Sequence, residues 1–150
     1  MILFNTRLKT LTDNEIKLVM QRRYGAEKSR GITKTYVFDI VLVETNEIVG
    51  QCDLRIGKSW YLYYLGNIGY TVYIPYRGHH YATKASRLLL QLAKDEGMDE
   101  LIITCSPENI ASYKTILQIP AEYLDTVDVP KEHDLYRRNE IRKCIFEIKI

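Results

Sequence analysis

The fold is decided by residues 68–96, IGYTVYIPYRGHHYATKASRLLLQLAKDE, in which a strand, a basic turn and a helix follow one another without a spacer. Residues 68–74 mix β-branched, aliphatic and aromatic side chains, which is typical of a strand, and Pro75 ends the run. Apolar side chains then recur at helical spacing, at Tyr81, Ala85, Leu88, Leu89 and Leu92. Gly97 suits the left-handed residue that closes a helix. These signals predict a strand–turn–helix unit.

The turn, residues 76–80, joins the carboxyl end of the strand to the amino end of the helix. The free N–H groups and the dipole of a helix start favour a phosphate or another anion. Arg77 adds a fixed positive charge whose planar guanidinium suits such a ligand. The sequence therefore predicts an anion-binding turn.

This turn resembles the acetyl-CoA pyrophosphate loop of the GCN5-related N-acetyltransferase (GNAT) family, which reads Arg/Gln-x-x-Gly-x-Gly/Ala between a strand and a helix. Arg77 and Ala82 match the ends of that motif, whereas His80 stands in place of its middle glycine. In the family that glycine lets the backbone approach the pyrophosphate. The imidazole of His80 either obstructs this approach or donates a hydrogen bond to phosphate, and the sequence leaves both alternatives open.

The resemblance implies that acetyl-CoA is the co-substrate and that its pantetheine arm lies between two splayed parallel strands. The cofactor-binding residues that it implies are Val72, Tyr73, Ile74, Arg77, Gly78, His79, His80, Tyr81, Ala82, Thr83, Asn109 and Ser112. Asn109 and Ser112 match the Asn-x-x-Ser/Ala start of the family's next helix, where the asparagine binds pantetheine amides. Backbone N–H groups around Tyr73 and Ile74 are expected to polarise the thioester carbonyl.

Residues 101–105, LIITC, form a short apolar run that predicts a strand buried on both faces. It is expected to be the parallel neighbour of the strand at residues 68–74, with a right-handed crossover through the helix. The strand ends then meet at one crevice, where ligands of such sheets bind. Ser106 is the predicted N-cap of the following helix, and Pro107 fits its first position.

Transfer of an acetyl group to an amine requires a base for the ammonium proton and an acid for the departing thiolate. The candidates for these roles are Asp53, Glu108 and Tyr113. Many family members carry a tyrosine acid seven residues after the asparagine, where this chain has Ile116. Tyr113 lies about one helical turn earlier and is the expected substitute.

Each of these assignments has an alternative. Asp53 also fits an outward-facing polar residue of a strand, and Tyr113 also fits packing against its helical neighbours Ile110 and Leu117. An acyl-enzyme route through Cys105 is the alternative to direct transfer. Direct transfer in a ternary complex is preferred, because positioning both substrates in one cleft supplies much of the acceleration.

The remaining elements are predicted from local patterns. Residues 2–8 indicate a strand, and Thr12 with Glu15 forms a capping box for a helix with an apolar stripe at Ile16, Val19 and Met20. A polar connection, residues 44–47, joins two predicted strands into a hairpin, residues 35–43 and 48–55.

The carboxyl-terminal third is predicted to hold two further strands, residues 121–129 and 136–150, with His133 as a loop residue between them. Residues 57–66 concentrate Trp60 and three tyrosines. Such side chains serve a substrate mouth, a contact between the subunits of a homodimer, or simply the core.

Composition bounds the class of protein. The chain has 150 residues, 46% of them hydrophobic, which suits one domain, residues 1–150, with a core of its own. It has 21 basic and 19 acidic residues, so neither nucleic acid nor a membrane is an expected partner. The three cysteines lack metal-ligand spacing and fit reduced thiols packed as small hydrophobes, so no metal and a cytoplasmic location are expected.

Together these observations predict an α/β fold, a single GNAT-like domain with a mixed central sheet of about six to seven strands and flanking helices. The predicted function is an N-acetyltransferase that acts on a small-molecule or peptide amine. One alternative is an acyl-CoA sensor without turnover, favoured by His80, Ile116 and Pro120. A nucleic-acid partner, favoured only by the Lys and Arg residues at 137–143, is the other.

Overall fold

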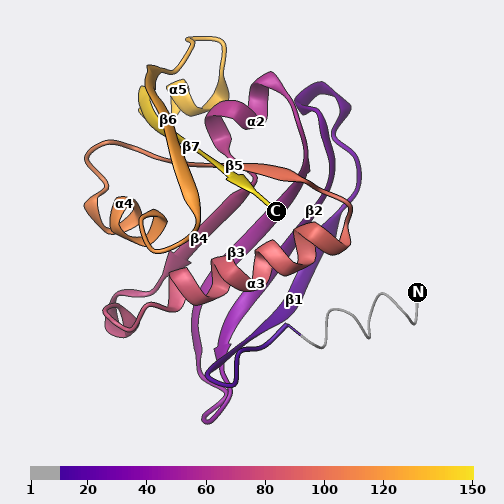
Figure 1. Cartoon of the computed structure of the whole chain (residues 1–150), viewed down its shortest axis with the longest axis vertical. Coiled ribbons are helices and arrows are strands. Elements are labelled where there is room, and N and C mark those ends of the chain that lie inside the picture. The colour runs from indigo at the N-terminus through magenta and orange to yellow at the C-terminus, as the bar shows by residue number, and fades with distance from the viewer. Residues whose placement is uncertain (1–10) are drawn as a thin grey trace.

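The computed structural model describes residues 11–150, which form two antiparallel sheets and the helices that pack against them (Figure 1). The first has the order β1-β2-β3-β4, with bounds Ile16–Tyr24, Ile32–Leu42, Ile48–Gly57 and Ile68–Val72. The second has the order β5-β7-β6, with bounds Glu100–Cys105, Arg142–Lys149 and Ala121–Asp128. The α-helices are α2 (Trp60–Leu65), α3 (Tyr81–Asp95), α4 (Ile110–Ile116) and α5 (Asp134–Arg137), and two 3-10 turns are η1 (Lys28–Arg30) and η2 (Ile74–Tyr76). The strand predicted for residues 2–8 lies outside the described residues.

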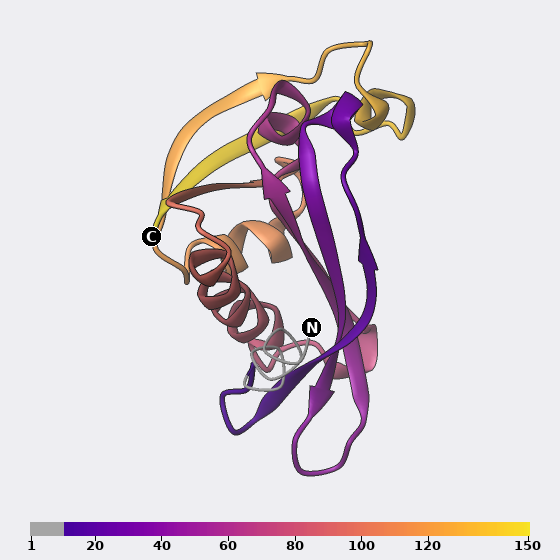
Figure 2. The ribbon, with the colours of Figure 1, turned by 90° about the vertical axis from the view of Figure 1, so that its right-hand side faces the viewer.

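The helix α3 covers one face of the four-stranded sheet and lies below the three-stranded sheet (Figure 2). Its apolar stripe is buried, as its spacing predicts: Ala85, Leu88, Leu89, Leu92 and Ala93. Phe38 and Leu54 on the facing strands are fully buried against the same core. Gly97 has a φ of +88°, in agreement with its predicted place after the helix. The mixed α/β fold is therefore confirmed.

The helix predicted to begin at Thr12 is wrong, because these residues lead into β1. Ile16 and Leu18 are buried whereas Val19 is exposed, which is the period of two of a strand. The Thr12 hydroxyl donates to the Ile16 carbonyl at 2.8 Å and closes a turn instead of capping a helix. Pairing of β1 along its length with residues 35–42 of β2 stabilises the extended form, and this tertiary contact overrides the local capping signal.

The strands β4 and β5 touch at one end only. The Asn67 amide donates to the Ile102 carbonyl at 2.7 Å, and the Asn67 side-chain oxygen accepts from the Ile102 amide at 2.8 Å. No ladder joins β4 to β5 in the described residues, and β5 pairs with β7 instead. The two strands therefore splay apart beyond Asn67. Burial alternates along β5, so its predicted burial on both faces is wrong.

The hairpin of β2 and β3 is confirmed, and the three cysteines are free and buried, as predicted.

The aromatic segment at residues 57–66 contains the helix α2, in which Tyr61 is buried and Trp60 is exposed. No helix among residues 11–150 is long and apolar enough to cross a membrane.

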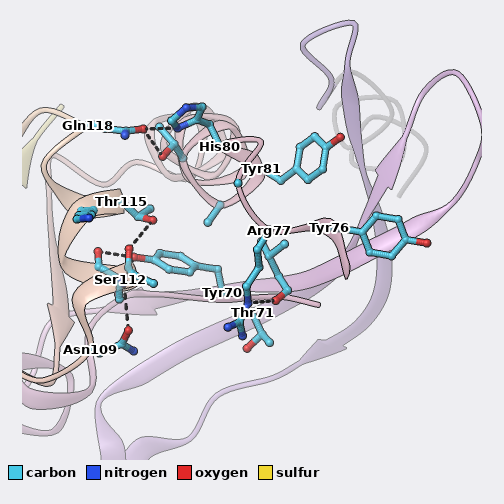
Figure 3. Close-up of a pocket in the computed structure, with 16 residues that line it drawn as sticks. Tyr70, Thr71, Tyr76, Arg77, His80, Tyr81, Asn109, Ser112, Thr115 and Gln118 are labelled. Atoms are coloured by element: carbon cyan, nitrogen blue, oxygen red, sulfur yellow. Dashed lines mark hydrogen bonds between the residues drawn. The ribbon is translucent and has the colours of Figure 1, made fainter. Parts of the chain in front are cut away.

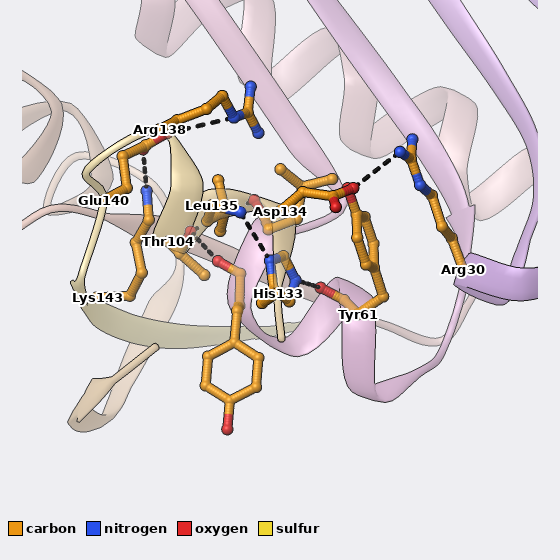
Figure 4. A network of polar contacts seen from close by, with 11 residues as sticks. Arg30, Tyr61, Thr104, His133, Asp134, Leu135, Arg138, Glu140 and Lys143 are labelled. Carbon is orange, nitrogen blue, oxygen red and sulfur yellow. Dashed lines mark hydrogen bonds and ion pairs between the residues drawn. The ribbon is translucent and has the colours of Figure 1, made fainter. Parts of the chain in front are cut away.

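The connection between β6 and β7 is more ordered than predicted. Residues 134–137 form α5, so the last strand begins at Arg142 and not at residue 136. His133 is fully buried, and its ring stacks on Tyr61 with centroids 4.3 Å apart (Figure 4). Its Nδ1 accepts from the Leu135 amide at 3.1 Å, and its Nε2 donates to the Tyr61 carbonyl at 2.9 Å. His133 lies in the connection before α5, as predicted, but its imidazole is buried and joins α5 to α2.

We expect His133→Ala to lower the free energy of unfolding by about 2–4 kcal/mol, because it opens a cavity, removes the hydrogen bond to the Tyr61 carbonyl and takes away the side-chain acceptor of the Leu135 amide. Urea unfolding followed by circular dichroism measures this change. The exposed residue His79 provides the control, and His79→Ala should cost less than about 0.5 kcal/mol. Equal losses in the two variants would contradict the anchoring role of His133.

Candidate active site

A cleft of about 400 Å³ lies at the amino end of α3, between the turn after β4 and the helix α4 (Figure 3). Most of the predicted cofactor-binding residues line it: Val72, Arg77, Gly78, His80, Tyr81, Ala82, Thr83, Asn109 and Ser112. Tyr73, Ile74 and His79 do not line the cleft. Ile74 is 77% exposed, and the His79 ring stacks on Tyr81 at 5.4 Å. Contact of these residues with acetyl-CoA stays a prediction.

The turn before α3 has the backbone conformation that a glycine would provide. Gly78 has a φ of +93°, and His80, the N-cap residue, has a φ of 63°. A left-handed conformation costs a residue with a side chain about 1–2 kcal/mol. The His80 ring is turned toward the far end of α4, where its Nδ1 lies 3.0 Å from the Gln118 side-chain oxygen. The imidazole accepts no hydrogen bond from the first turn of α3, so it leaves the N–H groups of that turn uncovered.

The charge of the cleft suits an anion. Arg77 and Lys114 line it, and within residues 11–150 no Asp or Glu is among its lining residues. The Arg77 Nε donates to the Val72 carbonyl at 2.9 Å, which fixes the guanidinium beside the end of β4. Together with the helix start, these two cations make a strongly electropositive pocket.

The peptide groups of β4 alternate between its partner β3 and the open gap toward β5. The Arg55 amide donates to the Asn67 carbonyl at one end of the pairing, and the Tyr73 amide donates to the Val49 carbonyl at the other. Alternation then directs the peptide groups of Tyr70 and Val72 into the gap. The Tyr73 N–H is occupied, which corrects its predicted role at the thioester carbonyl. By the same alternation the Val72 N–H faces the gap.

Tyr70 is the most informative lining residue that the sequence analysis missed. It extends from β4 toward α4, and its hydroxyl lies 2.8 Å from the Ser112 Oγ (Figure 3). Burial raises the pKa of Tyr70 to about 12, so the phenol keeps its proton. Other lining residues that were missed are Thr71, Tyr76, Ala111, Lys114, Thr115 and Gln118. The alternation of strand 68–74 places Tyr70 on the side of Ile68, but the sequence does not show what that side faces.

The helix α4 begins later than predicted. Asn109 is its N-cap, and the Asn109 side-chain oxygen accepts from the Ser112 amide at 3.1 Å. The prediction of Ser106 as the N-cap is therefore wrong. This bond leaves the amide nitrogen of Asn109 as the end of the side chain that can donate to a ligand in the cleft.

The three catalytic candidates lie in different places. Glu108 is exposed and lines none of the cavities described here. The Tyr113 ring packs edge-on against Phe146 at 5.8 Å, and Tyr113 also lies outside these linings. This position fits core packing, although its partner is Phe146 and not the predicted helical neighbours. A catalytic role for Glu108 or Tyr113 stays a prediction.

Asp53 lies on the outer face of the four-stranded sheet, opposite Gly69 of β4. Its side chain is 24% exposed, and its Oδ2 is 2.8 Å from the Arg55 guanidinium. Burial raises the pKa of Asp53, and Arg55 opposes that rise. A Cβ at Gly69 would come within 2.4 Å of Asp53 Oδ1, so the glycine makes room for this ion pair. Asp53 lines an outer cavity of about 650 Å³. Its side chain faces outward from the sheet, although most of its surface is covered by neighbouring residues.

A smaller cavity of about 220 Å³ continues from the cleft between the splayed strands, and Tyr70, Asn109 and Ser112 line both. Arg55 joins the smaller cavity to the outer one, because it lines both of them. Cys105 also lines the smaller cavity, and burial raises the pKa of its thiol to about 11. A thiol with that pKa is a poor nucleophile near neutral pH, which disfavours the acyl-cysteine route. Within residues 11–150, no group of three His, Cys, Asp or Glu side chains is arranged to hold a metal ion.

Comparisons with solved structures find several with the same fold. An acetyltransferase of the GNAT family from Bacillus anthracis has 23% identity and a TM-score of 0.58, with 75% of this chain and 65% of that chain covered. A microcin C7 self-immunity acetyltransferase in complex with acetyl-CoA and AMP has 19% identity, coverage of 77% and 61%, and a TM-score of 0.59. A ribosomal L7/L12 α-N-protein acetyltransferase in complex with coenzyme A has 15% identity, coverage of 81% and 64%, and a TM-score of 0.59.

This chain thus spans less than two thirds of the length of those proteins. A comparison with curated proteins finds no match. The family model described as an acetyltransferase (GNAT) domain matches residues 4–119. The chain therefore belongs to the GNAT family of acetyltransferase domains.

Proposed function

We propose that the chain transfers the acetyl group of acetyl-CoA to a primary amine by direct attack in a ternary complex. The observation that carries this proposal is the cleft at the start of α3, whose lining in the described part of the chain includes Arg77 and Lys114 and no carboxylate. The cleft adjoins the gap between β4 and β5, so an anionic cofactor bound there can extend an arm toward Tyr70. Family membership supports the same conclusion.

Different groups of this chain suit the phosphates, the pantetheine arm and the thioester of acetyl-CoA. Arg77 and the N–H groups of the first turn of α3 suit the phosphates. The Asn109 side chain and the Val72 peptide suit the amides of the pantetheine arm and the thioester carbonyl. Acetyl-CoA supplies the thioester that is broken in the reaction.

In the proposed step the ammonium first loses one proton, the amine nitrogen then bonds to the acetyl carbon, and the carbon–sulfur bond breaks. The second proton that the nitrogen loses passes to the departing sulfur, which yields an amide and the thiol of CoA. Asp53 accepts the ammonium proton, since burial raises its pKa and makes the carboxylate more basic. The Val72 N–H stabilises the charge on the carbonyl oxygen. Tyr70, whose pKa is about 12, holds its proton too tightly to transfer it to a thiolate of pKa about 8.5. It instead donates a hydrogen bond to the sulfur.

The acceptor is a small-molecule or peptide amine. The ribosomal protein named for one structural neighbour supports a peptide amine as one class of acceptor. An acyl-CoA sensor without turnover is a second candidate, favoured by His80 in the loop and Ile116 at the position of the family's tyrosine. It would bind acetyl-CoA and release no thiol with any amine.

We expect Arg77→Glu to weaken acetyl-CoA binding about 10- to 100-fold in a calorimetric titration, because it replaces a charge-assisted hydrogen bond with repulsion. Lys94→Glu makes the same change in net charge at the other end of α3 and should leave the affinity within about twofold. No binding by the wild-type protein, or an equal effect of both variants, would overturn the proposed cofactor site.

We expect Tyr70→Phe to lower kcat for thiol release about 100-fold while the affinity for acetyl-CoA stays nearly unchanged, because the lost hydrogen bond acts on the departing sulfur. A thiol-reactive dye measures the release. Tyr113→Phe tests the alternative acid and should keep kcat within about twofold. A larger loss in Tyr113→Phe than in Tyr70→Phe would assign the role to Tyr113.

We expect Asp53→Asn to lower kcat/KM about 100-fold and to remove the acidic limb of its pH profile. In the wild-type protein the proton must leave Asp53, so activity is lost as the pH falls through its raised pKa, above 3.8. Glu108→Gln should preserve both kcat/KM and the acidic limb of its pH profile. An unchanged limb in Asp53→Asn would show that another group is the base.

A further inference from the structure

The small cavity beyond Tyr70 is where an acceptor would meet the acetyl group. It shares Tyr70, Asn109 and Ser112 with the cofactor cleft and opens toward α5 and the start of β7. Its charged lining residues are Arg55, Arg138, Glu140 and Lys143. A volume of about 220 Å³ admits only the small end of a ligand.

The charged groups of this cavity do not balance. Lys143 is nearly buried, with 8% of its side chain exposed, and its Nζ lies 2.7 Å from Glu140 Oε1 (Figure 4). Arg55 has its own partner in Asp53 at 2.8 Å. The Arg138 Nε lies 4.0 Å from the other Glu140 oxygen, which is beyond hydrogen-bond length. Two carboxylates therefore serve three cations, and Arg138, with 59% of its side chain exposed, carries the surplus positive charge.

Arg138 projects from an anchored turn and not from a loose loop. The amides of Arg138 and Glu140 both donate to the Leu135 carbonyl, each at 3.0 Å. Between them Asn139 adopts a φ of 64°, which closes the turn. His133 ties the amino end of α5 to Tyr61 (Figure 4). The backbone that carries Arg138 is therefore already ordered, so ligand binding has to order the side chain alone.

We propose that the amine acceptor carries a carboxylate and that Arg138 is the residue that selects it. This inference rests on the proposed acetyl transfer and names the class of its acceptor. The guanidinium fork matches a carboxylate and can hold it by two hydrogen bonds. A carboxylate brings one negative charge, which equals the surplus. A phosphate monoester carries about 1.5 to 2 negative charges. The charge beyond one would be repelled by the Glu140 carboxylate.

The test compares pairs of amines that differ only in the anion, with thiol release from acetyl-CoA as the readout. The pairs are β-alanine with β-alaninamide, glycine with glycinamide, and phosphoethanolamine with ethanolamine. In the wild-type protein we expect kcat/KM to favour the carboxylate over its amide about tenfold. Arg138→Glu should abolish this preference by raising KM for the carboxylate, without a comparable loss for the amide.

Arg137→Glu is the matched control, because Arg137 is the exposed neighbour, makes the same charge change and lies outside the cavity lining. It should retain the preference. Equal rates for carboxylate and amide, a preference that survives Arg138→Glu, or a preference shown only for phosphoethanolamine would each overturn the inference while leaving acetyl transfer intact. No thiol release with any amine, although acetyl-CoA binds, would instead overturn the proposed function.

Discussion

The site depends on the contact that Asn67 makes between the two sheets. Asn67 is 3% exposed, and its side-chain amide donates to the carbonyls of Arg55 and Gly57 while its oxygen accepts from the Ile102 amide. An asparagine buried without these bonds would cost several kcal/mol, so this arrangement fixes where the sheets meet. Beyond Asn67, the facing edges of β4 and β5 form no backbone hydrogen-bond ladder with each other. Backbone groups left open in this way need a ligand or water, and the cleft lies beside them.

The charges on the two sides of this gap are arranged for different tasks. The cofactor cleft has two cations and no carboxylate in its lining, which suits phosphates. The side of the proposed acceptor instead has carboxylates that are each held by a cation, Asp53 by Arg55 and Glu140 by Lys143. A carboxylate near the phosphates would weaken cofactor binding, whereas an amine acceptor needs a carboxylate as its base. Because Asp53 lies across β4 from the cleft, both conditions can hold in a small domain.

The strand–turn–helix unit could be predicted because all its signals lie within thirty or so residues of one another. The strand residues, Pro75, the apolar stripe and Gly97 each act locally, and the structure agrees with them. The Thr12 capping box was also a local signal, but β1 forms because β2 lies beside it, and no single segment contains that information. His133 and Tyr70 have the same difficulty, since their importance comes from Tyr61 and Ser112, which lie 72 and 42 residues away. Local signals therefore predicted which residues gather at the start of α3, whereas the residues that gather around Tyr70 and α5 depend on contacts between segments far apart in the sequence.

The strand β4 links these parts because each of its residues points in one of three directions. Tyr70 extends on the inner side, toward α4, with its phenol at the cleft. Gly69 lies on the outer side, where the absence of a side chain admits the ion pair of Asp53 and Arg55. The free edge presents the Val72 peptide to the gap. Since the proposed donor to sulfur, base and carbonyl donor are positioned by one short strand, a shift in its register by one residue would exchange the two faces and displace all three. The bonds of Asn67 at the start of β4 oppose such a shift, so the contact that separates the sheets also sets the geometry of the proposed chemistry.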